Sequence, residues 1–168
     1  MLTGIGIMII TFVVMEGVAW AMHKYVLHGF MWFLHKSHHT KHDHAFEWND
    51  LFFAYYGTLA MLFFVFGSDP IDYRFWIGAG ITLYGIAYFV IHDVFIHRRL
   101  RVFGKSYNVY LKALNIAHKV HHSSSARDGA ASYGMLWVSW KYFRSAHEII
   151  RKKKQQEINR GSLLNQRT

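Results

Sequence analysis

The chain alternates between long apolar runs and shorter polar segments. The three longest apolar runs are Leu2–Met22, whose one charged residue is Glu16, then Leu51–Phe66 and Phe75–Ile91. A helix rises about 1.5 Å per residue, so runs of this length approach or reach across a hydrocarbon core of roughly 30 Å. The sequence therefore predicts three membrane-spanning helices. A turn at Gly67–Pro70, which holds the only proline, joins the second and third.

A fourth apolar piece, Gly129–Phe143, has two interpretations. As a fourth span it would repeat the first half of the chain, but it would export the basic run Arg151–Lys154. A packed or interfacial helix avoids that export and is favoured. The predicted fold is thus an all-α membrane protein with three or four transmembrane helices. Residues 1–150 form a single membrane-embedded domain, and residues 151–168 form a basic polar tail that is solvated or bound to lipid headgroups.

The composition agrees with a membrane protein and narrows the chemistry. Of the 168 residues, 52% are hydrophobic and 18% are aromatic. The absence of cysteine excludes thiolate zinc sites, iron–sulfur clusters, cysteine-ligated haem and disulfides.

The net charge of +9 is unevenly distributed. No lysine or arginine precedes the first apolar run, and the segment 67–74 carries one. Three lie between residues 23 and 50, and fifteen follow His97. Because positively charged loops stay in the cytoplasm, three crossings would place the ends of the first and third runs on the cytoplasmic side.

Histidines form two motifs that each occur twice. An H-x4-H pair begins just after the first and third apolar runs, and an H-x2-H-H motif follows after six intervening residues in the first half and twenty in the second. The ten histidines of these motifs are His23, His28, His35, His38, His39, His92, His97, His118, His121 and His122.

The spacings predict how these rings point. Positions i, i+3 and i+4 share one face of an α-helix, so each H-x2-H-H motif presents three rings together. Positions i and i+5 lie about 140° apart on a regular helix. Each H-x4-H pair therefore either serves two different ions or lies in a π-type turn. Ten imidazoles supply about five nitrogen ligands for each of two ions, which indicates a dinuclear metal site with helical extensions on the cytoplasmic side.

The ligand type narrows the choice of metal. Neutral imidazole suits zinc, copper, iron and nickel, and the H-E-x-x-H motif of zinc hydrolases is absent. Two redox-active ions facing a bilayer suit activation of dioxygen against a lipophilic substrate. Iron fits this best, while copper and manganese stay open.

Residues beside the motifs are candidates for hydrogen-bond partners of the rings, for helix caps and for further ligands. We expect the other ring N–H groups to be accepted by carboxylates, and the alternative for each carboxylate is a helix cap or a surface charge. The candidates are Asp43, Glu47, Asp93 and Asp128. Asn49 and Asp50 are typical of a helix cap. His42 and His44 are possible further ligands, whereas His147 is interpreted as structural or exposed.

Glu16 lies two turns before His23 on the same face of the first predicted helix. It is interpreted either as a partner of a histidine ring or as a protonated carboxyl that forms a hydrogen bond between helices.

Longer stretches around these motifs resemble the bacterial β-carotene hydroxylases, within the membrane-bound fatty-acid-hydroxylase superfamily of non-haem di-iron enzymes. The similarity covers roughly residues 10 to 140. The matching text is MEG at 15–17, HKYVLHG at 23–29, HKSHH at 35–39, HDHAFEWNDL at 42–51, YGIAYFVIHD at 84–93, AHKVHH at 117–122, RD at 127–128 and SYG at 132–134.

The resemblance implies an enzyme that hydroxylates carbon 3 of the β-ionone rings of β-carotene, giving β-cryptoxanthin and zeaxanthin. It further implies two irons held by the ten histidines, dioxygen as co-substrate, and electrons from ferredoxin or a similar donor. The expected location is the bacterial inner membrane, among membrane lipids and with no nucleic-acid partner. The fifteen basic residues after His97 could bind an acidic ferredoxin.

Other functions share parts of the pattern. A carotenoid ketolase or a fatty-acid or sterol hydroxylase would use the same metal site. A metal transporter would need a polar path through the bilayer centre, where only Glu16 is ionisable. A haem-b carrier would need paired histidines buried within its helices rather than clustered at their ends.

Overall fold

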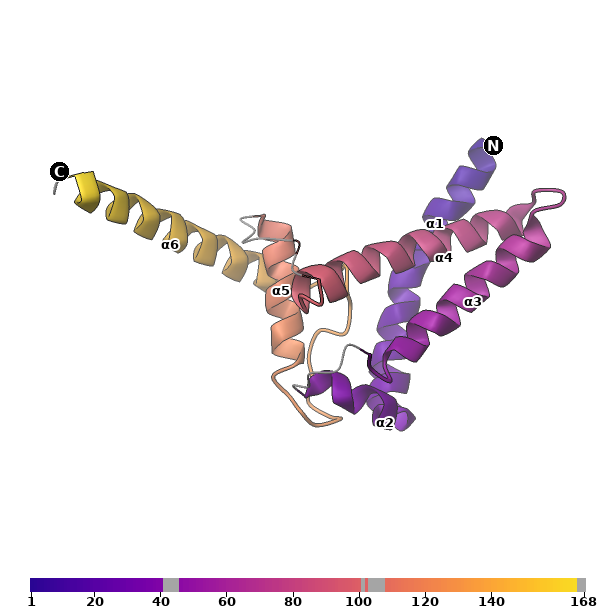
Figure 1. Ribbon diagram of the computed structural model, residues 1–168, viewed down its shortest axis with the longest axis horizontal. Coiled ribbons are helices and arrows are strands. Elements are labelled where there is room, and N and C mark those ends of the chain that lie inside the picture. Colours follow the sequence, from indigo (N-terminus) through magenta and orange to yellow (C-terminus); the bar gives the residue numbers. More distant parts are fainter. Residues whose placement is uncertain (41–45, 101, 103–107, 166–168) are drawn as a thin grey trace.

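In the computed structural model, which describes residues 1–40, 46–100, 102 and 108–165, the described residues form helices and connecting loops without a β-strand (Figure 1). The first long helix is α1 (Leu2–Ala21), which continues directly into the π-helix η1 (Met22–Phe30). A hairpin of α3 (Asp50–Gly67) and α4 (Tyr73–Tyr88) follows. The helix α4 continues into a second π-helix, η3 (Phe89–Ile96).

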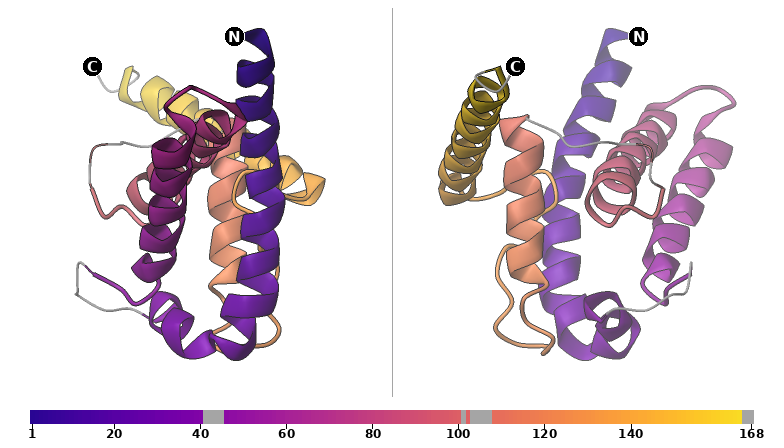
Figure 2. Two further views of the ribbon diagram at one scale, coloured as in Figure 1. Left: turned by 90° about the vertical axis from the view of Figure 1, so that its right-hand side faces the viewer. Right: turned by 60° about the vertical axis from the view of Figure 1, so that its left-hand side comes forward.

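Shorter elements connect these helices and complete the fold. Between the first long helix and the hairpin lie α2 (Trp32–His35) and the 3₁₀-helix η2 (Lys36–His39). After η3 come α5 (Val109–His121) and α6 (Trp140–Asn165). The helix α2 lies at the opposite end of the first long helix from the N-terminus (Figure 2).

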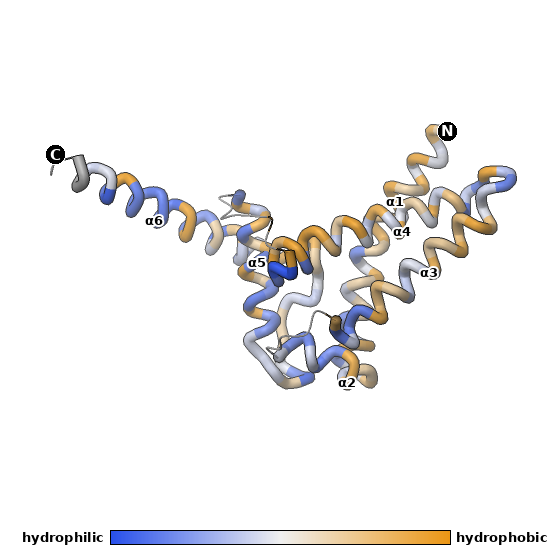
Figure 3. Tube along the Cα trace, in the orientation of Figure 1, coloured by the Kyte–Doolittle hydropathy of each residue, from blue (hydrophilic) through white to orange (hydrophobic). Residues whose placement is uncertain are grey.

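Three helices among the described residues are long and apolar enough to cross a membrane, which confirms the three predicted spans. They are Leu2–Phe30, Asp50–Gly67 and Tyr73–Ile96. Many of their apolar side chains are exposed, for example Ile10 and Val65, as expected where lipid rather than protein covers a helix. Most residues along these helices are apolar, and polar residues gather at the α3–α4 turn and on α6 (Figure 3).

The helix α4 packs between α1 and α3 by means of two glycines. A Cβ atom at Gly80 would lie 2.7 Å from the carbonyl oxygen of Met8 in α1, and one at Gly78 would lie 3.0 Å from that of Ala60 in α3. Small residues of this kind let membrane helices approach closely. The buried core of the three helices contains Met15, Ala60, Ile81 and Tyr84.

The segment Gly129–Phe143 differs from both interpretations of its sequence. It is not among the spans found in the described residues, and most of it is not a helix either: residues 130–139 form an irregular loop, and α6 begins at Trp140. Gly129 and Ser132 have positive φ angles of 86° and 66°, which interrupt a helix. The backbone of this loop bonds to side chains of the first long helix instead, as described below.

The helix α6 packs on α5 only through its first turns. Ala113 and Ala117 of α5 are buried against Tyr142 and Ala146 of α6. Beyond these contacts α6 projects away from the other helices, and its basic residues Arg151–Lys154 are exposed (Figure 1). The helix runs without a break through residues 150 and 151.

The close contact at Gly80 can be tested by substitution. We expect Gly80→Leu to lower the free energy of unfolding by about 1–3 kcal/mol, because a side chain there meets the α1 backbone. Gly6→Leu is the matched control, since nothing lies within 4 Å of a Cβ atom at Gly6. Thermal unfolding in detergent measures both, and equal stability of the two variants would contradict the packing.

Candidate metal centre

Each H-x4-H pair lies at the C-terminal end of a membrane span, in or at the end of a π-helix. His23 and His28 lie in η1, while His92 lies in η3 and His97 directly follows it. The N–H of His97 donates to the carbonyl oxygen of His92 at 2.8 Å, the i to i+5 bond of a π-turn. The ring centroids are 5.2 Å apart in the first pair and 4.5 Å apart in the second. The π-turn interpretation is confirmed, because each pair stays together.

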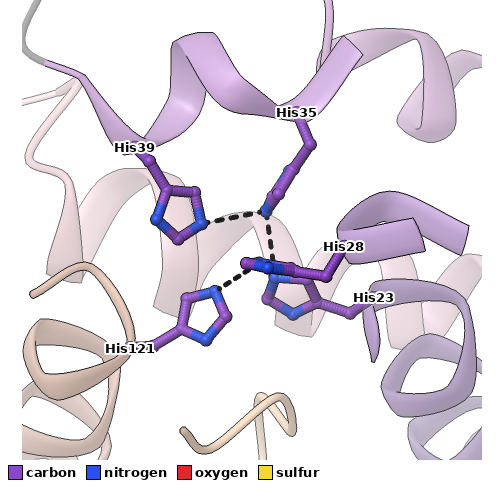
Figure 4. Close-up of side chains that lie close together, drawn as sticks. All are labelled: His23, His28, His35, His39 and His121. Atoms are coloured by element: carbon purple, nitrogen blue, oxygen red, sulfur yellow. Dashed lines mark hydrogen bonds between the residues drawn. The ribbon is translucent and has the colours of Figure 1, made fainter. Parts of the chain in front are cut away.

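Five buried or half-buried histidines form what we call the first cluster: His23, His28, His35, His39 and His121 (Figure 4). They come from η1, α2, η2 and α5, and one ring nitrogen of each lies within 4.8 Å of those of the others. The shortest Nε2–Nε2 distances are 3.0 Å between His23 and His35, 3.2 Å between His28 and His121, and 3.3 Å between His35 and His39.

Four histidines form the second cluster by the same measure: His38, His92, His97 and His118. The Nε2 atoms are 3.0 Å apart in the pair His38–His92 and 2.8 Å apart in the pair His97–His118.

His122 lies beside the second cluster. Its ring centroid is 4.4 Å from that of His118 and 4.7 Å from that of His38. Its Nε2 is buried and has no hydrogen-bond partner in the part of the chain that the structure describes. The structure thus brings all ten predicted histidines together, five in the first cluster and four with His122 at the second.

The H-x2-H-H motifs are divided between the clusters. In the first motif, His35 and His39 belong to the first cluster and His38 to the second; in the second motif, His121 belongs to the first and His118 to the second. The first motif spans α2 and the 3₁₀-helix η2 rather than one α-helix. Each motif therefore ties the two clusters to each other instead of presenting three rings to one point.

Most rings of the first cluster donate their Nδ1–H to neutral oxygen atoms. His23, His28 and His39 donate to backbone carbonyls at 3.0, 2.8 and 2.9 Å, and His35 donates to the amide oxygen of Asn49 at 2.8 Å. The three carbonyls belong to Tyr133, Arg127 and Ser124, in the loop after α5. Sequence analysis missed these partners, because a backbone carbonyl leaves no signal in the sequence. Asn49 does precede α3 as predicted, but its side chain bonds to His35 and does not cap the helix.

Two rings of the second cluster donate to carboxylates instead. His38 Nδ1 lies 2.8 Å from Glu47 Oε2, and His92 Nδ1 lies 3.2 Å from Asp93 Oδ2, as expected for these two acids. Asp128 is 84% exposed and pairs with Arg127 at 3.6 Å, so it is the surface charge of the alternative interpretation. His42, Asp43 and His44 lie outside the described residues.

Arg99, which sequence analysis did not single out, joins these acids. Its guanidinium lies 3.0 Å from Glu47 Oε1, 3.0 Å from Asp50 Oδ1 and 3.2 Å from Asp93 Oδ1. These carboxylates hold the pKa of Arg99 above its usual value, against the opposing effect of burial. One cation therefore fixes the two carboxylates that orient His38 and His92.

Glu16 forms the hydrogen bond between helices that one interpretation expected, and it also binds a loop that neither interpretation foresaw. Its Oε1 accepts the backbone N–H groups of Met135, Leu136 and Trp137, each at 2.9 Å, and its Oε2 accepts the hydroxyl of Tyr84 at 2.7 Å. The bond to Tyr84 joins α1 to α4, and none of these bonds goes to a histidine ring. Glu16 thus fastens to α1 the same loop whose Tyr133 carbonyl orients His23.

An apolar cavity of about 360 Å³ lies between the three spans and reaches both clusters. Its walls include Met15 of α1, Phe53 of α3 and Ile81 of α4. His23 of the first cluster and His92 of the second also line it. A cavity of this size with few polar groups is typical of a site for a small apolar ligand or for one end of a larger one.

Comparison of the sequence with known proteins finds several relatives of this chain. The β-carotene hydroxylase of Pseudescherichia vulneris is 37% identical over 132 residues, which are 79% of this chain and 75% of that protein. That of Pantoea ananas is 39% identical with the same coverage of both chains. The chloroplastic β-carotene 3-hydroxylase of Haematococcus lacustris is 40% identical over 135 residues, 73% of this chain and 39% of that protein.

This chain belongs to the β-carotene hydroxylase family. No family model and no solved structure matches it. Family membership makes the chain an oxidoreductase, and the relatives match over most of its length.

In this member of the hydroxylase family, the ring tautomers show that a metal ion fits the clusters. A carbonyl or carboxylate oxygen only accepts, so each Nδ1 bonded to one carries the ring proton, and the Nε2 of that neutral ring carries a lone pair. The pairs His23–His35 and His38–His92 therefore hold two lone pairs 3.0 Å apart, which repel unless a cation lies between them. Metal-ligating histidines show the same pattern, with Nδ1–H bonded to an outer acceptor.

A proton is a poor candidate for that cation. Burial, opposed by the bond to Asn49 and helped by the nearby rings, lowers the pKa of His35 to about 3. Burial, followed by the charge of neighbouring rings, likewise lowers the pKa of His121 to about 3 and that of His122 to about 2. These rings stay neutral at physiological pH, which is the form that binds metals.

The lowered pKa values predict how the stability of the metal-free protein depends on pH. An unfolded histidine titrates near 6.5, so between about pH 6.5 and 3 the unfolded chain binds protons that the folded one does not. We expect the free energy of unfolding to fall as the pH falls through this window. The slope is up to about 1.4 kcal/mol per pH unit for each such histidine. Melting temperatures of chelator-treated protein at pH 7.5 and 5 measure this, and a higher melting temperature at pH 5 would contradict buried neutral rings.

Proposed function

We propose that this chain is a non-haem di-iron monooxygenase that hydroxylates carbon 3 of the β-ionone rings of β-carotene, giving β-cryptoxanthin and then zeaxanthin. The names of its relatives support the substrate, and the name of the chloroplastic relative specifies position 3. The observation that carries the proposal is the mostly apolar cavity between three membrane spans, whose lining includes His23 of the first cluster and His92 of the second.

The ten predicted histidines would hold the two irons, one in each cluster. His122, with its unpaired Nε2, would complete five nitrogens at the second cluster. When bound, the ions would supply activation of dioxygen for insertion of one oxygen atom into a C–H bond. The chain itself supplies neutral ligands, their orientation by the Nδ1 acceptors, and burial that keeps bulk water away.

The cavity would position one ring of the substrate. Its volume is too small for a whole carotenoid, so one ring would enter between α1, α3 and α4 while the polyene chain stays among the lipids. Its lining is mostly aromatic and aliphatic, and a hydrocarbon ring forms no hydrogen bond with the polar side chains that it also includes, such as Asn49 and Tyr56. Position within the cavity would therefore be set by shape, with the ring near His23 and His92, which line the same cavity.

The distribution of positive charge supports an orientation in the bacterial inner membrane. Both π-helices, and the clusters with them, lie at the ends of spans that are followed by basic segments, so we place the metal centre on the cytoplasmic side. The exposed basic residues 151–154 of α6 come after the last histidine of the clusters in the sequence. They would attract an acidic electron donor such as ferredoxin.

The other functions that share the histidine pattern fit less well. A metal transporter needs a polar path between the spans, but Glu16 is occupied by four hydrogen bonds and the cavity is apolar. A carotenoid ketolase or a fatty-acid or sterol hydroxylase would give different products, which the experiment below separates.

The decisive experiment is expression in a bacterium that accumulates β-carotene, followed by pigment analysis. We expect β-cryptoxanthin and zeaxanthin with the native chain. We expect neither with His38→Ala or His121→Ala, because each removes a ring from one cluster. His147→Ala is the control, since His147 is exposed on α6 and should leave the products unchanged. Keto-carotenoids, or unaltered β-carotene beside hydroxylated fatty acids, would overturn the proposal.

The role of the cavity can be tested separately from the metal centre. Gly85 lines the cavity, and the nearest atom to a Cβ there would be 4.0 Å away on Phe53. We expect Gly85→Leu to fill the space and lower β-carotene turnover by roughly tenfold or more, the equivalent of about 1–3 kcal/mol of overpacking.

Gly57→Leu is the matched control in α3. Gly57 is exposed, and nothing lies within 4 Å of a Cβ atom there. Metal content should stay at the native level in both variants. Unchanged turnover by Gly85→Leu with normal expression would exclude this cavity as the site of the ring.

A further inference from the structure

We propose that the two metal positions are inequivalent, and that the second cluster binds its ion more tightly than the first. This inference rests on the proposed function, because it assumes that both clusters hold metal. It concerns the hydrogen-bond acceptors of the rings rather than the rings themselves. The difference comes from the atoms that accept the Nδ1–H bonds, which are neutral on one side and carboxylate on the other.

The acceptors of the first cluster carry no formal charge. They are three backbone carbonyls and the side-chain amide of Asn49, at 2.8–3.0 Å from Nδ1. Such oxygen atoms fix the tautomer and the direction of a ring. Their partial charge polarises the N–H bond much less than a full negative charge would.

The acceptors of the second cluster are carboxylates that have little contact with solvent. The side chains of Glu47 and Asp93 are only 8% and 10% exposed, and each bonds to a ring of this cluster. Asp50 joins them through Arg99. No carboxylate is bonded to a first-cluster ring among the described residues, whereas two are bonded to rings of the second cluster.

Negative charge at this distance favours a bound cation in two ways. A carboxylate that accepts the Nδ1–H bond makes Nε2 a stronger electron donor, and loss of such a partner typically lowers metal affinity by 10–100-fold. The two carboxylates also attract the ion directly, with little screening because their side chains are largely buried. Arg99 limits the second effect while it holds the acids in position.

The test is a titration of full-length, chelator-treated protein in detergent with cobalt(II), without oxygen, following its visible absorption and the bound metal per chain. We expect two binding steps in the native protein, with dissociation constants at least about tenfold apart. Glu47→Gln keeps an oxygen that can accept from His38 but removes the charge. It should weaken the tight step by about 10–100-fold and leave the other step unchanged.

The reciprocal variant is Asn49→Asp, which places a carboxylate of nearly the same shape behind His35 in the first cluster. It should tighten the weak step and bring the two constants together, a gain that a purely structural role would not give. Asp93→Asn provides a second removal at the other carboxylate. Glu148→Gln, at an exposed acid on α6, should change neither step.

Two results would overturn the inference while leaving the proposed function intact. One is a native titration in which both ions bind with the same constant. The other is a titration of Glu47→Gln in which the tight step is unchanged, whether or not the weak step changes. A chain that binds no cobalt would instead remove the metal centre, and the proposed function with it.

Discussion

The structure depends on the repulsion between nitrogen lone pairs of facing histidine rings, which no group of the protein itself relieves in the described residues. Imidazole rings face one another through Nε2 atoms at about 3 Å, and burial holds the pKa of rings such as His35 and His38 below its usual value. Burying polar atoms without partners costs free energy, and several such rings in one place cost more. A pair of cations turns each of these contacts from unfavourable to favourable, so folding and metal binding are expected to be coupled.

Two features of the backbone hold the rings in this arrangement. The π-helices at the ends of the first and third spans bring residues five positions apart onto one turn. The loop after α5 then supplies three carbonyl oxygens that fix the tautomers of His23, His28 and His39. Glu16 fastens that loop to α1 through three N–H groups, within an otherwise apolar helix where an ionisable residue is expensive and therefore informative.

The spans, the ten histidines and their gathering at one end could be predicted because each follows from a local pattern. Apolar length gives the spans, and the position of each H-x4-H pair after a span gives the shared location. The assignment of rings to clusters could not be predicted, because His38 and His39 are adjacent in sequence but belong to different clusters. The loop at residues 130–139 was missed for a related reason. Its apolar side chains suggest a helix, while its backbone groups are required by His23 and Glu16, and long-range hydrogen bonds of that kind have no sequence signature.

The distribution of charge around the cavity connects the site with its substrate. Glu47, Asp50, Asp93 and Arg99 are paired beside the second cluster, and three of them, Asp50, Asp93 and Arg99, also line the cavity. The rest of the lining is mostly aromatic and aliphatic, and Glu16 is bonded to the loop and to Tyr84. Because the charged side chains are paired with one another, they can act on the proposed ions while costing an apolar ligand less than isolated charges would. The same pairing would let one short chain combine a polar, highly ordered centre with the apolar substrate that we propose.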